Sequence, residues 1–182
     1  MKKRALIIAA IIVLVILAYV GYQFATTKSK SPAQTVSSDK NDFKVTVTYS
    51  RPFKKGRLIF GEKSENALVP FGQYWRLGAN EATEITFSKD VEFAGTKVQA
   101  GKYRMYAIPA KDQWEIRLNS ELGEWGYAEP DYSKDVNKVT IPSESSPQAT
   151  EQFTILLKEE ADHIEMHLIW DTTLIRVPIK SV

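Results

Sequence analysis

The feature that most limits the fold of this chain is a two-residue alternation of apolar and polar side chains, which begins at residue 43 and recurs almost to the end. In FKVTVTYS (43–50), Phe43, Val45 and Val47 alternate with lysine and threonine, as in a strand buried on one face. Eight further strand-like segments follow between polar turns: 84–88, 91–93, 102–108, 113–119, 137–141, 152–158, 163–170 and 173–179. Nine short strands without a long helical repeat predict an all-β, antiparallel β-sandwich or jelly-roll-like domain with one short helix near residues 64–68. The last two segments, joined by Asp171 and Thr172, predict a closing hairpin.

The first 25 residues have a different character. MKKR is followed by an uninterrupted apolar run, ALIIAAIIVLVILAYV (5–20), which continues with one interruption to Ala25. About twenty apolar residues in a helix match the roughly 30 Å hydrocarbon core of a bilayer. We therefore predict an N-terminal transmembrane helix in residues 1–25, with residues 5–25 in the membrane and the positive residues 2–4 in the cytoplasm. The alternative is a cleaved signal peptide, although Gln23 lies where a cleavage site prefers a small residue.

Residues 26–42 are polar, rich in Ser, Thr and Lys, and contain Pro32. This composition predicts a flexible linker before a single domain over residues 43–182. Residues 1–41 hold six of the 24 Lys and Arg but only one of the 22 Asp and Glu, which leaves 18 basic and 21 acidic side chains in residues 42–182. A mildly acidic domain without a basic stripe argues against nucleic acid as a partner.

Several classes of catalytic and cofactor site are excluded by the residues present. The chain has no cysteine, which removes disulfides, cysteine-based zinc sites and thiol nucleophiles. It also lacks a phosphate-binding glycine loop and the serine and zinc hydrolase motifs. His163, Glu165 and His167 share one strand face, but the two histidines would lie about 13 Å apart, too far for one ion. We therefore expect no metal and no cofactor, and we interpret that face as solvated.

The best candidate site lies where the alternation stops, between residues 51 and 83. YWRLGANEAT (74–83) has neither a helical nor a strand period, and Gly78 predicts a backbone conformation that other residues avoid. Arginine suits bidentate recognition of a carboxylate or phosphate. The predicted ligand-binding residues are Arg51, Arg57, Trp75, Arg76, Asn80, Glu81 and Thr83. Trp75 is also expected to pack in the core.

A structural role for the same residues is the alternative, because loops that cross a sandwich need hydrogen-bond partners. In that case Arg76 would pair with Glu81. Trp125 and Tyr127, in the loop 120–135, are expected to cover one open end of the core, with stacking on a sugar or peptide as the alternative.

Several blocks of the chain resemble the bacterial family catalogued as domain of unknown function 2911. They are YSRP (49–52), KGR (55–57), IFG (59–61), LVPFG (68–72), WRLGANEAT (75–83) and AGKYRMYAIP (100–109). The resemblance extends from about Ser31 to the end of the last strand, and implies an exported β-rich domain, usually behind a signal peptide, without an established activity. Two features differ from the family pattern: the N-terminus looks retained, and the pair His163/His167 is not part of it.

Together these features favour a single-pass protein of the bacterial cytoplasmic membrane whose domain is extracytoplasmic (periplasmic) and binds a small anionic ligand, a glycan or an envelope protein. If the N-terminal segment is cleaved, the domain would instead be secreted. Two further functions stay open. One is a structural envelope protein without a small-molecule site. The other is a hydrolase, which needs two carboxylates within about 5–10 Å of each other in a cleft; Glu81 is the candidate for one of them. A binding protein rather than an enzyme is the favoured interpretation.

Overall fold

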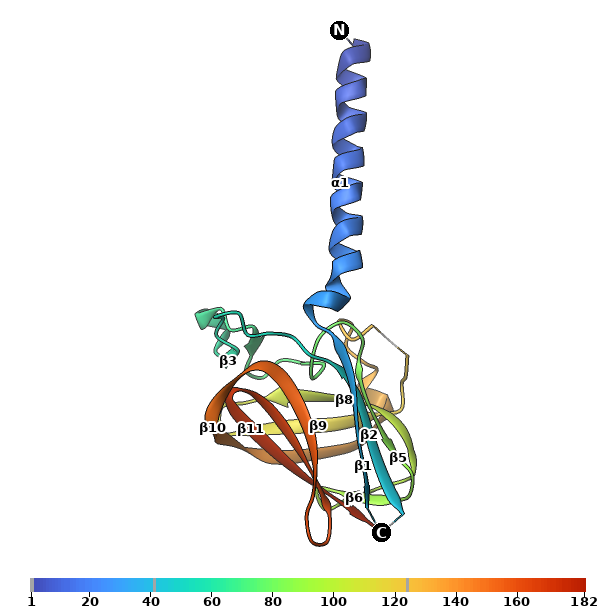
Figure 1. The fold of residues 1–182 in the computed structure, drawn as a ribbon, viewed down its shortest axis with the longest axis vertical. Helices are drawn as coiled ribbons and strands as arrows, with labels where there is room; N and C mark the ends of the chain where they lie inside the picture. The colour runs from blue at the N-terminus through green and yellow to red at the C-terminus, as the bar shows by residue number, and fades with distance from the viewer. Residues whose placement is uncertain (1, 41, 124) are drawn as a thin grey trace.

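A computed structural model describes residues 2–40, 42–123 and 125–182, and all side chains in these ranges except those at positions 2, 5, 6, 8–10 and 23–25. A long N-terminal helix, α1 (Lys2–Lys30), projects from one end of a β-domain (Figure 1). The strands are β1 (Ala33–Lys40), β2 (Phe43–Ser50), β3 (Phe60–Gly61), β4 (Val69–Pro70), β5 (Thr83–Phe87), β6 (Val91–Phe93), β7 (Thr96–Val98), β8 (Gly101–Pro109), β9 (Gln113–Asn119), β10 (Asp135–Glu159) and β11 (Ile164–Ser181). Two single 3₁₀ turns, η1 (Lys63–Glu65) and η2 (Tyr132–Lys134), interrupt the loops.

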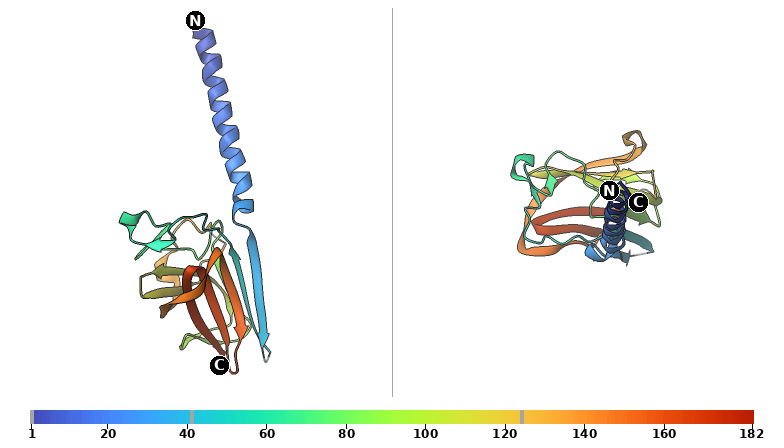
Figure 2. Two further views of the ribbon diagram at one scale, coloured as in Figure 1. Left: turned by 60° about the vertical axis from the view of Figure 1, so that its left-hand side comes forward. Right: turned by 90° about the horizontal axis from the view of Figure 1, so that it is seen from above.

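Nine strands form one sheet in the order β1-β2-β5-β8-β9-β10-β11-β6-β7, and β3 and β4 form a separate parallel pair. Neighbouring strands of the large sheet are antiparallel throughout. The long strand β10 pairs with β9 over residues 135–142 and with β11 over residues 143–159. One half of the sheet ends with β9 and the other begins with β11, and β10 belongs to both. The sheet therefore bends over on itself and does not divide into two separate sheets (Figure 2).

The core lies between the two halves of the bent sheet. Burial alternates along β2 as its sequence predicts, with Phe43, Val45 and Val47 all buried. The rings of Phe87 in β5 and Phe93 in β6 are 6.0 Å apart, which brings distant members of the strand order into contact. Burying each such side chain contributes roughly 1.5–3 kcal/mol to folding. Aromatic side chains fill the end of the core nearest α1: Phe60, Trp75, Trp114, Phe153 and Trp170.

The prediction of an all-β, antiparallel domain with a short helix is confirmed, and η1 overlaps the predicted helical segment. The predicted strands 137–141 and 152–158 prove to be parts of the single strand β10. The predicted hairpin at Asp171–Thr172 is wrong, since β11 runs straight through it. Asp171 has a φ of 52° and pairs with Thr150 between two shifts in register, at which the additional residues lie in β10.

The predicted flexible linker over residues 26–42 is also wrong where the structure describes it. α1 continues to Lys30 and ends before Pro32, whose ring disfavours a helical residue ahead of it. β1 then pairs with β2 along its whole length, from Ala33 opposite Ser50 to Lys40 opposite Phe43. The polar composition of β1 is consistent with its position at the edge of the sheet, where one side of the strand faces solvent.

The N-terminal segment is helical, as predicted, and its large apolar side chains are exposed where the structure describes them. Large apolar residues between Ile7 and Tyr22 are 43–65% exposed. Within the described residues, however, no helix has both the length and the hydropathy needed for a membrane span. The helix is therefore confirmed, and its membrane-spanning character is not.

Candidate functional site

The aperiodic segment YWRLGANEAT forms a crossover between β4 and β5, and each part of it is held by a specific contact. Trp75 exchanges two backbone hydrogen bonds with Ala107 of β8, at 2.8 and 2.9 Å. The Thr83 hydroxyl donates to the carbonyl of Leu77 at 2.7 Å, which closes the loop between them. The Asn80 amide donates to the carbonyl of Ser31 at 3.1 Å. The lack of a regular period therefore reflects contacts made residue by residue.

Gly78 allows the crossover to approach β2 closely. Its φ is 147°, and a Cβ at this position would lie 2.5 Å from the carbonyl oxygen of Ser50. Both the conformation and the contact exclude larger residues, as the sequence predicts for this glycine.

One side of the crossover borders a cleft of about 640 Å³, a size typical of sites for small organic ligands. Four of its lining residues are basic: Lys30, Lys55, Arg57 and Arg76. None of the described residues that line it is an aspartate or a glutamate. The cleft therefore presents positive charge without a carboxylate of its own to neutralise it.

Arg76 is the most buried of the four basic residues that line this cleft. Its Nε is buried and has no hydrogen-bond partner among the residues that the structure describes. Burial lowers the pKa of the Arg76 guanidinium, while the nearby hydroxyl groups of Tyr74 and Tyr127 act in the opposite direction. Gly126 makes room for the stem of the side chain, since a Cβ there would lie 2.6 Å from Cδ of Arg76. The loops around Arg76 thus admit its side chain but leave a polar atom unused.

Tyr74 and Arg104 support this arrangement and were missed in the sequence. The Tyr74 hydroxyl donates to the carbonyl of Gly126 at 2.9 Å and accepts from Nη2 of Arg104 at 2.6 Å. Arg104 is only 1% exposed, and its Nε and Nη1 have no partner within the described chain. One signal was available in the sequence: Arg104 is a charged residue within the predicted strand 102–108, and the aromatic loop 120–135 follows later in the chain.

The three predicted arginines do not converge on one point. Arg57 lines the same cleft as Arg76, although its Nε and Nη2 also donate to the carbonyls of Lys54 and Phe53. Arg51 instead donates to the carbonyl of Phe153 at 3.2 Å and to the hydroxyl of Thr154 at 2.9 Å. Its side chain joins the end of β2 to β10, so its role is structural.

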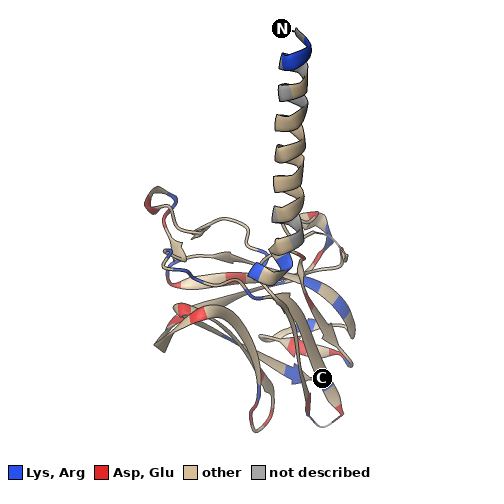
Figure 3. Ribbon diagram, turned by 45° about the horizontal axis from the view of Figure 1, so that its top comes forward, with Lys and Arg blue, Asp and Glu red and all other residues tan. Residues whose placement is uncertain are grey.

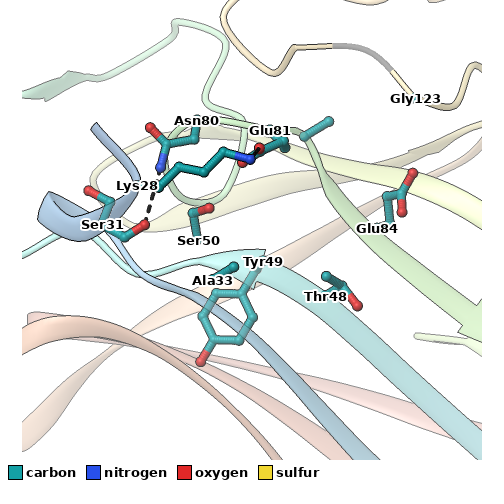
Figure 4. Close-up of a pocket in the computed structure, with 11 residues that line it drawn as sticks. Lys28, Ser31, Ala33, Thr48, Tyr49, Ser50, Asn80, Glu81, Glu84 and Gly123 are labelled. Carbon is teal, nitrogen blue, oxygen red and sulfur yellow. Dashed lines mark hydrogen bonds and ion pairs between the residues drawn. The ribbon is translucent and has the colours of Figure 1, made fainter. Parts of the chain in front are cut away.

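The other side of the crossover borders a smaller pocket of about 270 Å³, which includes Asn80 and Glu81 (Figure 4). Glu81 forms an ion pair with Lys28, with 2.8 Å between Oε1 and Nζ. The predicted alternative of an Arg76–Glu81 pair is therefore wrong. A second acid, Glu84, also lines this pocket and is paired with Lys102. Lys28 lowers the pKa of Glu81, whereas a general acid at neutral pH needs a raised pKa. Glu81 is therefore poorly suited to be the general acid of a hydrolase.

Two smaller predictions also need correction. Trp125 and Tyr127 were expected to cover the core, but they are 47% and 79% exposed, and Tyr127 borders the larger cleft. His167 was expected on a solvated face, but it is 5% exposed and contacts Glu165 at 2.5 Å. Across the described residues, no group of three or more His, Asp or Glu is placed to hold a metal ion.

Comparison with curated proteins and with solved structures finds no match. A family described as "protein of unknown function (DUF2911)" matches residues 31–179, which covers the β-domain from the start of β1 almost to the end of β11. The match includes the crossover and the loops that line both pockets. The chain therefore belongs to the DUF2911 family.

Proposed function

We propose that the domain binds a small anionic ligand in the larger cleft, with Arg76 as the main contact to the anion. The observation that carries this proposal is the half-buried guanidinium of Arg76, which has an unpartnered Nε in a cleft lined by cations. A buried charge is costly unless it is paired and hydrogen-bonded. A carboxylate or phosphate in the cleft would supply both the opposite charge and the missing acceptor.

The alternative is that these arginines only hold loops, as the contacts of Arg51 do. Arg76 differs from Arg51 because its buried Nε has no hydrogen-bond partner among the described residues. A purely structural role would leave that group without the contacts that justify its burial. This difference favours ligand binding over a structural envelope protein.

The test is thermal unfolding of Arg76→Gln in the presence of small anions. The full-length chain is melted with sodium acetate, citrate or phosphate, each compared with sodium chloride at equal ionic strength. The wild type should be stabilised by at least one anion, because a ligand of the folded state alone raises its melting temperature. Arg76→Gln should lose that stabilisation while melting within a few degrees of the wild type without ligand.

Arg51→Gln is the matched control. It should melt at a lower temperature, because it loses two contacts to β10, yet keep the stabilisation by the same anion. If Arg76→Gln instead unfolds many degrees early and no anion stabilises the wild type, the residue is structural and the proposed function is wrong.

We further propose that α1 attaches the domain to a bacterial cytoplasmic membrane, with the N-terminus inside and the domain outside the cytoplasm. Support comes from the apolar run 5–20 and from the exposure of large apolar residues along the helix. Basic residues lie at both ends of the helix, three at positions 2–4 and two at Lys28 and Lys30 (Figure 3). The larger number lies at the N-terminus, which the positive-inside rule places in the cytoplasm.

The absence of cysteine makes this topology easy to test. Ser181→Cys, near the exposed C-terminus, should react in intact cells with a thiol reagent that does not cross the inner membrane. The protein should also stay in the membrane fraction after washing at alkaline pH. Release of a shortened chain into the soluble fraction would instead show that the N-terminal segment is a cleaved signal.

A further inference from the structure

Apart from its cations, the cleft that holds Arg76 has an apolar and aromatic lining. Two of the lining residues, Trp75 and Trp170, are almost fully buried and stack on each other, with ring centroids 5.8 Å apart and an angle of 18° between the ring planes. Leu68, which is 41% exposed, and Val69 line it as well. A lining of apolar and aromatic residues with a few polar groups is typical of a site for an organic ligand rather than for a hydrated inorganic anion.

Tyr127 adds a ring on the solvent side of the cleft. The side chain is 79% exposed, which leaves the face of a large aromatic ring accessible to a ligand. It is close enough to Arg76 for the two groups to interact electrostatically, as is Tyr74. Arg76, Tyr74 and Tyr127 therefore line the same cleft, so a ligand bound at Arg76 has aromatic side chains within the same site.

We propose that the ligand is an aromatic acid, whose anionic group binds Arg76 while its flat apolar ring packs against Tyr127 and the apolar lining of the cleft. This inference rests on the proposed function, because it needs an anion at Arg76. Aromatic rings prefer offset or edge-to-face contacts with other rings, which an exposed tyrosine at the rim can provide. The stable position of the Tyr74 ring, fixed by Arg104 and Gly126, would define the inner end of the site.

The experiment uses three probes that separate charge from ring: phenylacetate, acetate and 2-phenylethanol. Binding of each to the full-length chain in a non-ionic detergent is measured by titration calorimetry, with glucuronate as a fourth probe that joins a carboxylate to a sugar ring. Phenylacetate should bind at least tenfold more tightly than each of the other three. Arg76→Gln should abolish its binding.

Tyr127→Ala should weaken phenylacetate binding about 2- to 12-fold, the range that corresponds to one aromatic contact, and should leave acetate binding unchanged. Trp125→Ala is the matched control, because Trp125 is an exposed aromatic residue of the same loop that does not line the cleft. It should bind phenylacetate like the wild type.

The outcomes separate this inference from the proposed function. If glucuronate or acetate binds as tightly as phenylacetate, still dependent on Arg76, the site takes an anion but the aromatic acid is wrong. The same holds if Tyr127→Ala has no effect on phenylacetate. If Arg76→Gln changes the binding of none of the anions, the proposed function itself fails.

Discussion

At the scale of single residues, the site depends on the difference between Arg51, whose Nε and Nη2 donate to β10, and Arg76, which lines the cleft and whose Nε has no partner among the described residues. Arg51 reaches two acceptors on β10, whereas the Nε of Arg76 reaches none among the described residues. The sequence singled out both residues by the same reasoning. It could not separate them, because the partners of Arg51 at Phe153 and Thr154 are about 100 positions away in the chain. Only the fold decides which long side chain finds an acceptor.

Gly78 provides a prediction at this scale. Gly78→Ala should lower the free energy of unfolding by about 3 kcal/mol or more, because it combines an unfavourable φ with a Cβ that meets the Ser50 carbonyl. Gly95→Ala is the control: its φ is 83°, but a Cβ there meets nothing within 4 Å. It should cost only about 1–2 kcal/mol, the conformational term alone. Urea unfolding measures both, and equal losses would contradict the importance of the Ser50 contact.

A second residue-scale prediction concerns Arg51. Arg51→Met should destabilise the fold by about 2 kcal/mol, since hydrogen bonds from a charged group contribute roughly 1.5–3 kcal/mol. The change is expected in urea unfolding, with the anion affinity of the cleft preserved. A variant as stable as the wild type would show that the contacts to Phe153 and Thr154 do not hold β2 to β10.

At the scale of elements, the alternation of residues predicts where strands lie but not where they end or bend. Burial alternates in β2, β5 and β9 as their sequences predict. β10 is predicted as two strands because the polar stretch between its halves has no apolar face. The strand nevertheless continues through this stretch, where its register with β11 shifts between Ser145 and Thr154. β1 was missed for a similar reason, since an edge strand needs fewer apolar side chains than a central one.

The pairing of β1 with β2 predicts slow hydrogen exchange in a segment that looks like a linker. Amides of residues 33–40 that point toward β2 should exchange far more slowly than those of an unstructured chain, because opening them requires separating the two strands. Exchange measured by mass spectrometry on the full-length chain checks this. If residues 33–40 exchange at the rate of a free peptide, β1 is not paired with β2 in solution and the segment is a flexible linker.

At the scale of the whole molecule, the end of α1 meets both pockets. Lys28 and Ser31 border the smaller pocket (Figure 4). Lys30 and Ser31 border the larger cleft. The sequence placed a helix before a β-domain but separated them by a flexible segment. It could not predict that two residues of the crossover would contact this end of the helix. Asn80 donates to Ser31, just after the helix, and Glu81 pairs with Lys28 in its last turn. That junction follows from tertiary contacts and has no periodic signal.

The Lys28–Glu81 pair makes the junction sensitive to acid. Because Lys28 lowers the pKa of Glu81 in the folded state, the pair stabilises the protein above the unfolded pKa of about 4.3, and that stabilisation is lost as the pH falls through the lower, folded value. The difference in melting temperature between the wild type and Glu81→Gln should therefore be constant above about pH 5 and should shrink below about pH 4. A difference that stays constant down to pH 3 would contradict the ion pair.

The most direct measurement of the central claim follows the Nε–H signals of the arginines by ¹H–¹⁵N NMR spectroscopy during titration with sodium phenylacetate, using sodium chloride at equal ionic strength as the reference. The Nε–H signal of Arg76, assigned through Arg76→Lys, should shift strongly and exchange more slowly with water, because the anion provides its missing acceptor. The signal of Arg51 should not move, since its Nε already donates to Phe153. An Arg76 signal that follows ionic strength alone, with phenylacetate and also with citrate and phosphate, would contradict the assignment of this cleft as an anion-binding site.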